Sequence, residues 1–400
     1  MNLFFQSPFR SDRPPSMVLL VTITMMGTIA MHMFIPAMPD TARDLHTTAA
    51  VVQLTVTMYV IGLAVGQLVY GPLSDRFGRR PVLLCGLLLF VLASAMAAMA
   101  GSIGELVVAR VLQALGACSG LVLGRAMVRD VTTADKAAGS MAVLLSAISI
   151  APALAPALGG YLVVWAGWRA MFMLLTLIAA GMLFWSVLAL PETNRNTVPL
   201  PGMRAMFNSY VSLLRRPVFR GYALGGCASS TSLYGFFAAS PFIFIDLLHR
   251  SPDEFGLYYL LIVATLSLGS LAASRLTRRF NIRTLTKAGN VVQIVASLAL
   301  LVADRSGLLS VVWVLGPMML YASGVGMAGS SAIAGAISAD PKAIGAASGL
   351  YGCMQMLYAG LATLVVSLWP SQSALPVAVL LLASAILARW AFRHAAGARF

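Results

Sequence analysis

Two ionisable side chains lie inside long apolar stretches of this sequence. His32 is about 15 residues past Met17, roughly 22 Å along a helix, and is the only histidine in the middle of such a stretch. Its imidazole, with a usual pKa of about 6.5, suits proton exchange, although a structural hydrogen-bonding histidine is the alternative. Arg110 lies some six residues into another stretch, where a guanidinium must face protein or a water-filled cavity unless it extends to the headgroups. Together they are candidates for a coupled proton site.

The helix that carries Arg110 presents a consistent face. At about 100° per residue, one arc holds Arg110, Gln113, Ala117, Gly120 and Gly124. An arginine and an amide are thus followed by small residues, which permit close helix packing.

A short charged segment separates two apolar stretches and has the form G-x-x-x-D-R-x-G-R-R. Its defining residues are Gly71, Asp75, Arg76, Gly78, Arg79 and Arg80. Glycines permit close approach and a tight turn, while one acid among three cations can form a switchable ion-pair latch. The alternative is that these basic residues only set the membrane orientation.

A third pattern combines two prolines with two glycines: Pro152, Pro156, Gly159 and Gly160. Proline removes a helix hydrogen bond, and glycine allows close helix crossing, so the pattern predicts a bend that could rock. Packing alone is the alternative.

Other side chains could line a substrate cavity, although helix packing explains each of them equally well. They are Tyr59, Tyr234, Phe237, Gln293, Gln355 and Tyr358. Asp40, near the outer end of the first apolar stretch, is an alternative proton site to His32.

The elements that must position these residues are membrane-spanning helices. Only 10% of the 400 residues are charged and 59% are hydrophobic. Spanning backbone must satisfy its own hydrogen bonds, and continuously apolar runs of about 20 residues exclude a barrel. We therefore expect an all-α bundle with twelve spans at 17–36, 50–70, 81–100, 104–127, 138–163, 169–190, 218–245, 254–274, 285–303, 308–334, 343–368 and 374–394.

The net charge of +14 reflects topology and does not indicate a nucleic-acid partner. Of 27 Lys and Arg residues, all but five fall in the tails and the even-numbered loops; the exceptions are Arg43, Arg110, Arg169, Arg250 and Arg305. The positive-inside rule then places both termini in the cytoplasm.

A polar interruption divides the chain. We expect an N-terminal tail (1–16), a six-helix bundle (17–190), a cytoplasmic linker (191–217), a second six-helix bundle (218–394) and a C-terminal tail (395–400). A weak repeat relates the halves, because Ser270-x4-Arg275-x2-Arg278-Arg279 echoes the segment at Gly71. Two such halves around a midplane site are the plan of alternating-access transporters.

Other classes lack their signatures. The four cysteines are isolated, with no disulfide or metal spacing. Paired catalytic acids, a nucleophilic serine motif and a P-loop are missing, so an intramembrane enzyme using Ser119 or His32 is only a distant alternative. We expect a secondary transporter without cofactor or metal.

These motifs resemble those of the major facilitator superfamily. The segment from Gly71 to Arg80 is similar to its loop after the second helix, which latches the inward gate, and Arg110 with Gln113 is similar to its R-x-x-Q-G-x-G-A motif, with Ala114 at the first glycine. The run at Pro156 resembles the antiporter motif G-x-x-x-G-P-x-x-G-G.

Within that family the chain resembles the bicyclomycin/chloramphenicol-resistance (Bcr/CflA) branch over nearly its full length. The similar segments are I-P-A-M-P-D at 35–40, Arg125 to Asp130, Trp165 to Arg169, Pro191 to Thr193 and Ala346 to Gln355. The branch commonly has an aspartate where this sequence has His32, so neutral, zwitterionic or anionic substrates are expected more than lipophilic cations.

The resemblance implies a proton-coupled antiporter that exports drugs or other amphipathic small molecules across a bacterial inner membrane. A dedicated exporter of a metabolite or amino-acid derivative is the alternative. The expected partners are the substrate, protons and the lipid bilayer, and a monomer suffices because the two halves enclose one pathway.

Overall fold

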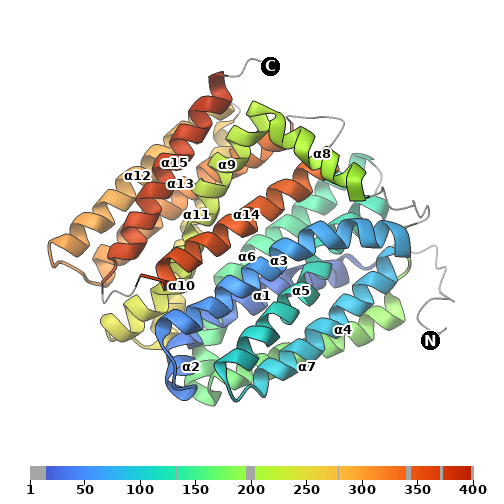
Figure 1. Ribbon diagram of the computed structural model, residues 1–400, viewed down its shortest axis with the longest axis horizontal. Coiled ribbons are helices and arrows are strands. Elements are labelled where there is room, and N and C mark those ends of the chain that lie inside the picture. Colours follow the sequence, from blue (N-terminus) through green and yellow to red (C-terminus); the bar gives the residue numbers. More distant parts are fainter. Residues whose placement is uncertain are drawn as a thin grey trace.

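The computed structural model describes residues 15–131, 134–194, 203–277, 279–338, 344–369 and 373–397, and it is helical throughout these ranges apart from turns and short connections (Figure 1). The helices of the N-terminal half are α1 (Met17–Met33), the 3₁₀ turn η1 (Ile35–Ala37), α2 (Met38–Asp44), α3 (Ala49–Phe77), α4 (Arg79–Ala98), α5 (Ile103–Val131), α6 (Ala134–Ala166) and α7 (Trp168–Ala189). Helix α8 (Met203–Arg215) follows. The C-terminal half contains α9 (Pro217–Thr231), α10 (Leu233–Pro241), the π-helical turn η2 (Phe242–Leu247), α11 (Pro252–Leu276), α12 (Ile282–Arg305), α13 (Val311–Ile337), α14 (Ile344–Ser367) and α15 (Leu375–Gly397).

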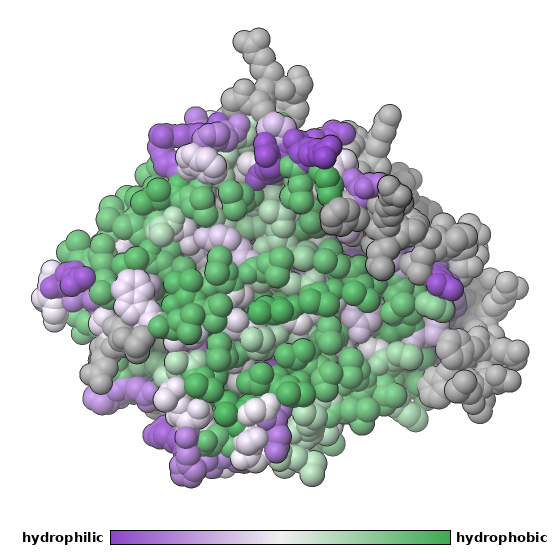
Figure 2. All heavy atoms as spheres, viewed as in Figure 1, coloured by the Kyte–Doolittle hydropathy of each residue, from purple (hydrophilic) through white to green (hydrophobic). Residues whose placement is uncertain are grey.

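The helices have the length and composition of membrane spans. Within the described residues, 11 helical segments are long and apolar enough to cross a bilayer, and a shorter apolar helix covers Ile150–Ala166 of α6. Large apolar side chains on the outside, such as Leu92, Leu177 and Ile386, are more than half exposed. Figure 2 shows a broad apolar band with polar residues gathered above and below it. The expected all-helical membrane fold is confirmed.

Element boundaries differ from expectation where local chemistry is special. The first span turns into η1 at Pro36 and continues as α2, because proline supplies no backbone N–H to the helix ladder. The seventh span is divided into α9, α10 and η2. The region 191–217, expected as a polar linker, contains the additional helix α8, which packs against α9 and α14.

Two groups of helices lie side by side in Figure 1, α1 to α7 in one and α9 to α15 in the other. The most extensive contacts between these halves are those of α3 with α14 and of α6 with α11. Further contacts join η1 to α10 and α11, and α2 to η2. The halves therefore meet at the end of the bundle where α1 stops and α3 begins, and the α3–α14 contact continues along α3 as far as Gln67, which faces Gly352.

Small residues set the spacing inside the N-terminal half. A Cβ atom on Gly120 would lie 2.6 Å from the carbonyl oxygen of Ile23, and one on Gly124 would lie 2.0 Å from the hydroxyl of Thr24. The stripe of small residues on α5 thus permits contact with the backbone of α1, which lets Arg110 on the same helix reach that backbone.

Candidate functional site

Arg110 is completely buried in the N-terminal half. Its Nη1 donates to the carbonyl oxygen of Ala30 at 3.1 Å and to Oε1 of Gln113 at 2.6 Å. Gln113 in turn donates from Nε2 to the hydroxyl of Ser94 at 2.8 Å. The arginine and amide predicted to share a face of α5 therefore form one chain of hydrogen bonds that links α1, α4 and α5.

Aromatic rings surround the Arg110 guanidinium. Its central carbon lies 4.1 Å from the ring centroid of Tyr59, 5.3 Å from that of Phe34 and 5.9 Å from that of Phe172. Cation–π attraction stabilises such a charge, most strongly where water is excluded. In the described part of the chain, no ion pair involves Arg110, and its buried Nε and Nη2 atoms have no hydrogen-bond partner. The site thus holds a desolvated cation with unused donors.

Tyr59, predicted as a cavity residue of the second span, is part of this cluster. It is fully buried, and its hydroxyl donates to the carbonyl oxygen of Gly27 at 2.8 Å. The backbone of α1 therefore accepts hydrogen bonds from side chains of both α3 and α5. A change in the position of α1 would disturb Tyr59 and Arg110 together.

His32 faces the opposite half of the protein. It is 2% exposed, and its Nδ1 lies 2.6 Å from the hydroxyl oxygen of Tyr259 in α11. Its ring also lies beside Tyr234 and Phe237 of α10, with centroid distances of 6.1 and 5.8 Å. Two predicted cavity residues of the C-terminal half thus meet the predicted proton site. Tyr259, which sequence reasoning missed, carried no signal beyond its place near the start of an apolar span.

The hydrogen bonds of His32 and Arg110 go to different partners. Arg110 reaches the carbonyl of Ala30, two residues before His32 in α1, from inside the N-terminal half. The His32 side chain instead leaves α1 towards α10 and α11. The link between them therefore runs through the backbone of α1, and direct coupling of the pair stays a prediction.

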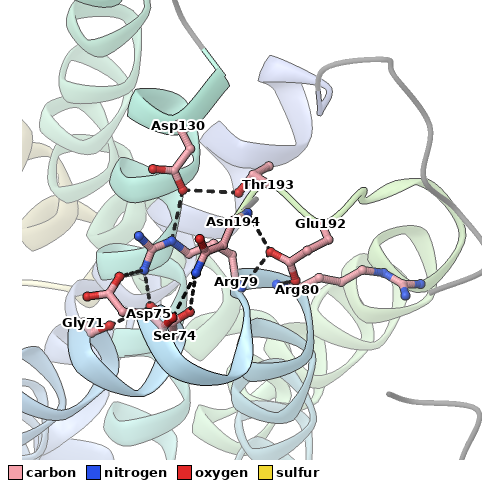
Figure 3. A network of polar contacts seen from close by, with 9 residues as sticks. All are labelled: Gly71, Ser74, Asp75, Arg79, Arg80, Asp130, Glu192, Thr193 and Asn194. Carbon is pink, nitrogen blue, oxygen red and sulfur yellow. Dashed lines mark hydrogen bonds and ion pairs between the residues drawn. The ribbon is translucent and has the colours of Figure 1, made fainter. Parts of the chain in front are cut away.

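The charged segment from Gly71 to Arg80, which spans the end of α3 and the start of α4, forms a dense polar network (Figure 3). Arg79 Nε donates to Asp130 Oδ2 at 3.0 Å, and its Nη1 lies 2.6 Å from Asp75 Oδ1 and 2.5 Å from the hydroxyl of Ser74. Asp75 is half-exposed, whereas the side chain of Arg79 is only 9% exposed. The network ties α3, α4 and α5 together, and Asp130 of α5 is a partner that spacing alone did not identify.

Glu192 adds a second set of contacts from beyond the end of α7. Its carboxylate accepts from the backbone N–H groups of Arg79 at 2.9 Å, Arg80 at 3.0 Å and Asn194 at 2.9 Å. The first two belong to the first turn of α4, where N–H groups have no partner within the helix. A carboxylate at this position is stabilised by the helix dipole. Glu192 therefore caps α4 from 112 residues away along the chain.

The two glycines of this segment differ from each other. Gly78 has φ +92° between α3 and α4, which makes it the turn, and a Cβ there would lie 2.6 Å from Glu192 Oε2. Gly71 lies inside α3, with no atom within 4 Å of an added Cβ, so the tight turn expected there does not form. Arg76 stacks on Phe77 at 5.0 Å, and Arg80 donates from Nη2 to the Val187 carbonyl at 2.8 Å.

The proline and glycine run of α6 lies at the contact between the halves. A Cβ on Gly159 would lie 2.1 Å from the carbonyl oxygen of Met33, and one on Gly160 would lie 2.2 Å from that of Pro252 in α11. From the other side, a Cβ on Gly256 would lie 3.1 Å from the carbonyl oxygen of Pro156. Pro152 and Pro156 are both within α6, which continues through them. Backbones of opposite halves thus touch where this run is placed.

The remaining predicted cavity residues are distributed over the C-terminal half. Gln293 is buried and donates from Nε2 to the Ser229 carbonyl at 2.9 Å, while its Oε1 accepts from the hydroxyl of that serine at 3.0 Å. Gln355 Nε2 donates to the Ser230 hydroxyl at 3.2 Å, and the Tyr358 hydroxyl donates to Ser384 at 2.9 Å. These contacts hold α9, α12, α14 and α15 together.

Asp40, the alternative proton site, lies on α2, where it forms an ion pair with Arg43. A surface cavity of about 630 Å³ adjoins it, with an ion pair of Asp44 and Arg169 at 2.5 Å on its wall. The cavity is lined by Asp40, Arg43, Asp44, His46, Ala166, Gly167, Trp168 and Arg169.

Among the described residues, no group of three or more His, Cys, Asp or Glu residues could hold a metal ion.

Comparison with known proteins relates this architecture to one family. Residues 20–363 match the Major Facilitator Superfamily. Multidrug resistance protein D of Escherichia coli is 30% identical, covering 94% of each chain, and a chloramphenicol resistance protein of Pseudomonas aeruginosa is 32% identical, covering 95% of this chain and 90% of the relative. A bicyclomycin resistance protein homolog of Haemophilus influenzae is 26% identical, covering 83% and 84%.

Solved structures agree on the fold. A bacterial homolog of the human lysosomal transporter Spinster, in an inward-facing and unoccupied conformation, has a TM-score of 0.76 at 14% identity, covering 96% of this chain and 98% of that one. A D-xylose–proton symporter has a TM-score of 0.72 at 16% identity, covering 93% and 97%. The chain therefore belongs to the Major Facilitator Superfamily, a family of secondary transporters that are not enzymes and need no cofactor.

Proposed function

We propose that the chain is a proton-coupled exporter of amphipathic small molecules that works by alternating access. The observation that carries the proposal is the hydrogen bond between His32 of the N-terminal half and Tyr259 of the C-terminal half. A titratable side chain that joins the halves links protonation to their separation. The names of the relatives, which refer to multidrug, chloramphenicol and bicyclomycin resistance, support export of small molecules.

The proposed location is a bacterial inner membrane with both termini in the cytoplasm. The concentration of Lys and Arg in the tails and alternate loops supports this orientation. The end of the bundle that contains η1, α2 and η2 then faces outward, and the contacts of the halves at that end correspond to an inward-facing conformation. The moving bodies are the bundles 17–190 and 218–394, connected by the linker 191–217, and a monomer is the working unit.

In the proposed cycle, His32 takes up a proton when the halves separate at the outer end. Separation breaks the contact with Tyr259 and opens the imidazole to outer water. Arg110 binds the carbonyl of Ala30 on the same helix, close to His32 in the chain. Repulsion between the Arg110 guanidinium and a protonated imidazole then favours loss of the proton from His32. Substrate binding from inside and protonation of His32 favour different conformations of the two halves, which couples substrate binding to proton release.

The polar network around Arg79 acts as the latch of the inner gate in this proposal. Arg79 is held by Asp130 within the N-terminal half, while the half-exposed Asp75 is free to exchange partners when the inner ends of the halves approach. Glu192 fixes the turn that presents them. The close α6–α11 contact at Gly160 serves as the surface on which the halves rock.

The test is efflux from everted vesicles of an exporter-deficient strain, with a chemically varied drug panel and with or without a protonophore. We expect His32→Ala and Arg110→Ala to abolish the protonophore-sensitive component. His46→Ala, at an exposed outer histidine, and Arg250→Ala, at an exposed outer arginine, are the matched controls and should retain it. Unchanged proton-coupled efflux in His32→Ala would remove His32 from the mechanism and favour Asp40 as the proton site.

A further inference from the structure

A cavity of about 470 Å³ lies between the two halves, at the end of the bundle where α3 begins. The N-terminal half lines it with the first turn of α3, including Ala49, Ala50 and Gln53. The C-terminal half lines it with Phe242 of η2, the end of α14 and the start of α15. A volume of this size is typical of small-molecule pockets, and an occupant would contact both halves at once.

The pairing of α3 with α14 shows which way Gln53 faces. The two helices run side by side (Figure 1), and the hydroxyls of Thr57 and Thr363 are hydrogen-bonded at 2.7 Å. Gln53 precedes Thr57 by one turn and therefore shares its face of α3. Val366, which follows Thr363 by about one turn on α14, also lines the cavity. Gln53 is thus directed towards the opposite half.

The side chain of Gln53 is buried without a hydrogen-bond partner. The residue is 6% exposed. Its backbone carbonyl accepts from Thr57 at 3.4 Å, whereas its amide group makes no hydrogen bond with any residue that the structure describes. A buried amide costs free energy unless it is hydrogen-bonded, and its nitrogen carries two donors. The cavity therefore contains a polar group that is available to a ligand.

The first turn of α3 adds two further donors. Thr48 caps the helix, and its hydroxyl accepts from the N–H of Val51 at 3.4 Å. The N–H groups of Ala49 and Ala50 precede this one and have no acceptor within the helix. Because the N-terminus of a helix carries a partial positive charge, these donors attract an anionic group.

The wall that the C-terminal half supplies is largely aromatic and apolar. It includes Phe242, Val366, Trp369 and Val377. Such side chains suit the flat body of an aromatic ligand, whose charged end would then lie at the donors of α3.

We propose that this cavity binds a small aromatic anion, with a carboxylate or sulfonate group on a body of one or two rings. The anionic group accepts from the Gln53 amide and from the first turn of α3, and the rings pack against the C-terminal half. Because the occupant joins the halves, it stabilises the conformation in which this end of the bundle is closed. Its effect on transport rests on the proposed export function and orientation: an aromatic anion on the outer side inhibits efflux.

The first experiment measures binding to the purified full chain in detergent by equilibrium dialysis. The probes are naphthalenesulfonate, the neutral naphthalenesulfonamide and the cationic naphthyltrimethylammonium, which share one aromatic body. We expect the sulfonate to bind about fivefold more tightly than the sulfonamide, and the cation to bind most weakly. Gln53→Leu should weaken sulfonate binding about tenfold, because a hydrogen bond to a charged group is lost.

Three further measurements separate recognition from folding and from binding elsewhere. Gln67→Leu makes the same change about 21 Å further along α3, beside Gly352, and should leave sulfonate binding unchanged. The ligand-free melting temperature of Gln53→Leu should equal or exceed that of the wild type, since a buried amide without a partner does not stabilise the fold. Gln53→Glu keeps the shape of the side chain, and its negative charge should weaken binding of the sulfonate more than that of the sulfonamide.

The inference is overturned if the sulfonate binds no better than the sulfonamide, or if Gln53→Leu binds it as the wild type does. Loss of sulfonate binding in Gln67→Leu in place of Gln53→Leu would also overturn it, because the anion would then lie deeper between the halves.

Inhibition is tested in right-side-out membrane vesicles with the sulfonate outside, where it neither crosses the bilayer nor carries protons. Efflux should fall in the wild type, and Gln53→Leu should need about tenfold more sulfonate for the same effect. Equal sensitivity of the two would refute closure by the occupant. Sulfonate binding through Gln53 without any gradient-driven efflux would refute the proposed function and leave the binding site standing.

Discussion

Replacement of Glu192 with alanine should destabilise the protein more than its surface position suggests. The carboxylate accepts from the N–H groups of Arg79 and Arg80 at 2.9 and 3.0 Å, and alanine leaves both without a side-chain partner. Hydrogen bonds to a charged group and helix capping contribute about 1–2 kcal/mol each when partly buried, so we expect a loss of about 2–4 kcal/mol. With an unfolding entropy of about 2.1 cal/mol/K per residue over 400 residues, the melting temperature falls by about 2–5 °C.

The assay is thermal unfolding of the purified protein in detergent, followed by intrinsic fluorescence. Glu105→Ala is the matched control, because that carboxylate accepts one N–H, from Gly101 at 2.9 Å, in an exposed position. The control should change the free energy of unfolding by less than about 0.5 kcal/mol. Equal melting temperatures for the Glu192 and Glu105 variants would refute the capping argument.

Three further substitutions test other contacts. Tyr259→Phe removes the hydrogen-bond partner of His32 in the opposite half, a contact of about 1 kcal/mol. We therefore expect the region around His32 to react about fivefold more with a labelling reagent added from the outer side. Unchanged labelling would contradict the bridging role of Tyr259. Gly160→Leu would place its Cβ 2.2 Å from the carbonyl oxygen of Pro252, so outer closure should fail and efflux should fall at least tenfold at normal membrane levels; full efflux would refute the close contact. Gly78→Ala would force a residue with a Cβ into a backbone conformation with φ +92°, which is strained for residues other than glycine. The free energy of unfolding, measured by denaturant titration, should therefore fall by about 1–2 kcal/mol. A change near zero would refute this argument.

The sequence alone was sufficient to predict the helical membrane fold. Runs of about 20 apolar residues can satisfy their backbone hydrogen bonds in lipid only as helices, so neither packing nor partners had to be known. The face of α5 that carries Arg110 and Gln113 was predictable for a similar reason. Helical periodicity places residues three and four apart together, and the structure shows their side chains hydrogen-bonded.

Only the tertiary structure decided which side chains meet across the chain. Glu192 caps a helix 112 residues away, and Tyr259 reaches His32 over 227 residues, whereas local spacing carries no information on such contacts. The rotation of α1 also separates the surroundings of His32 from those of Arg110, although both lie in similar apolar stretches. Local composition determines which segments form membrane-spanning helices. The rotation of each helix about its axis, which decides what its polar side chains contact, depends on the packing of all its neighbours.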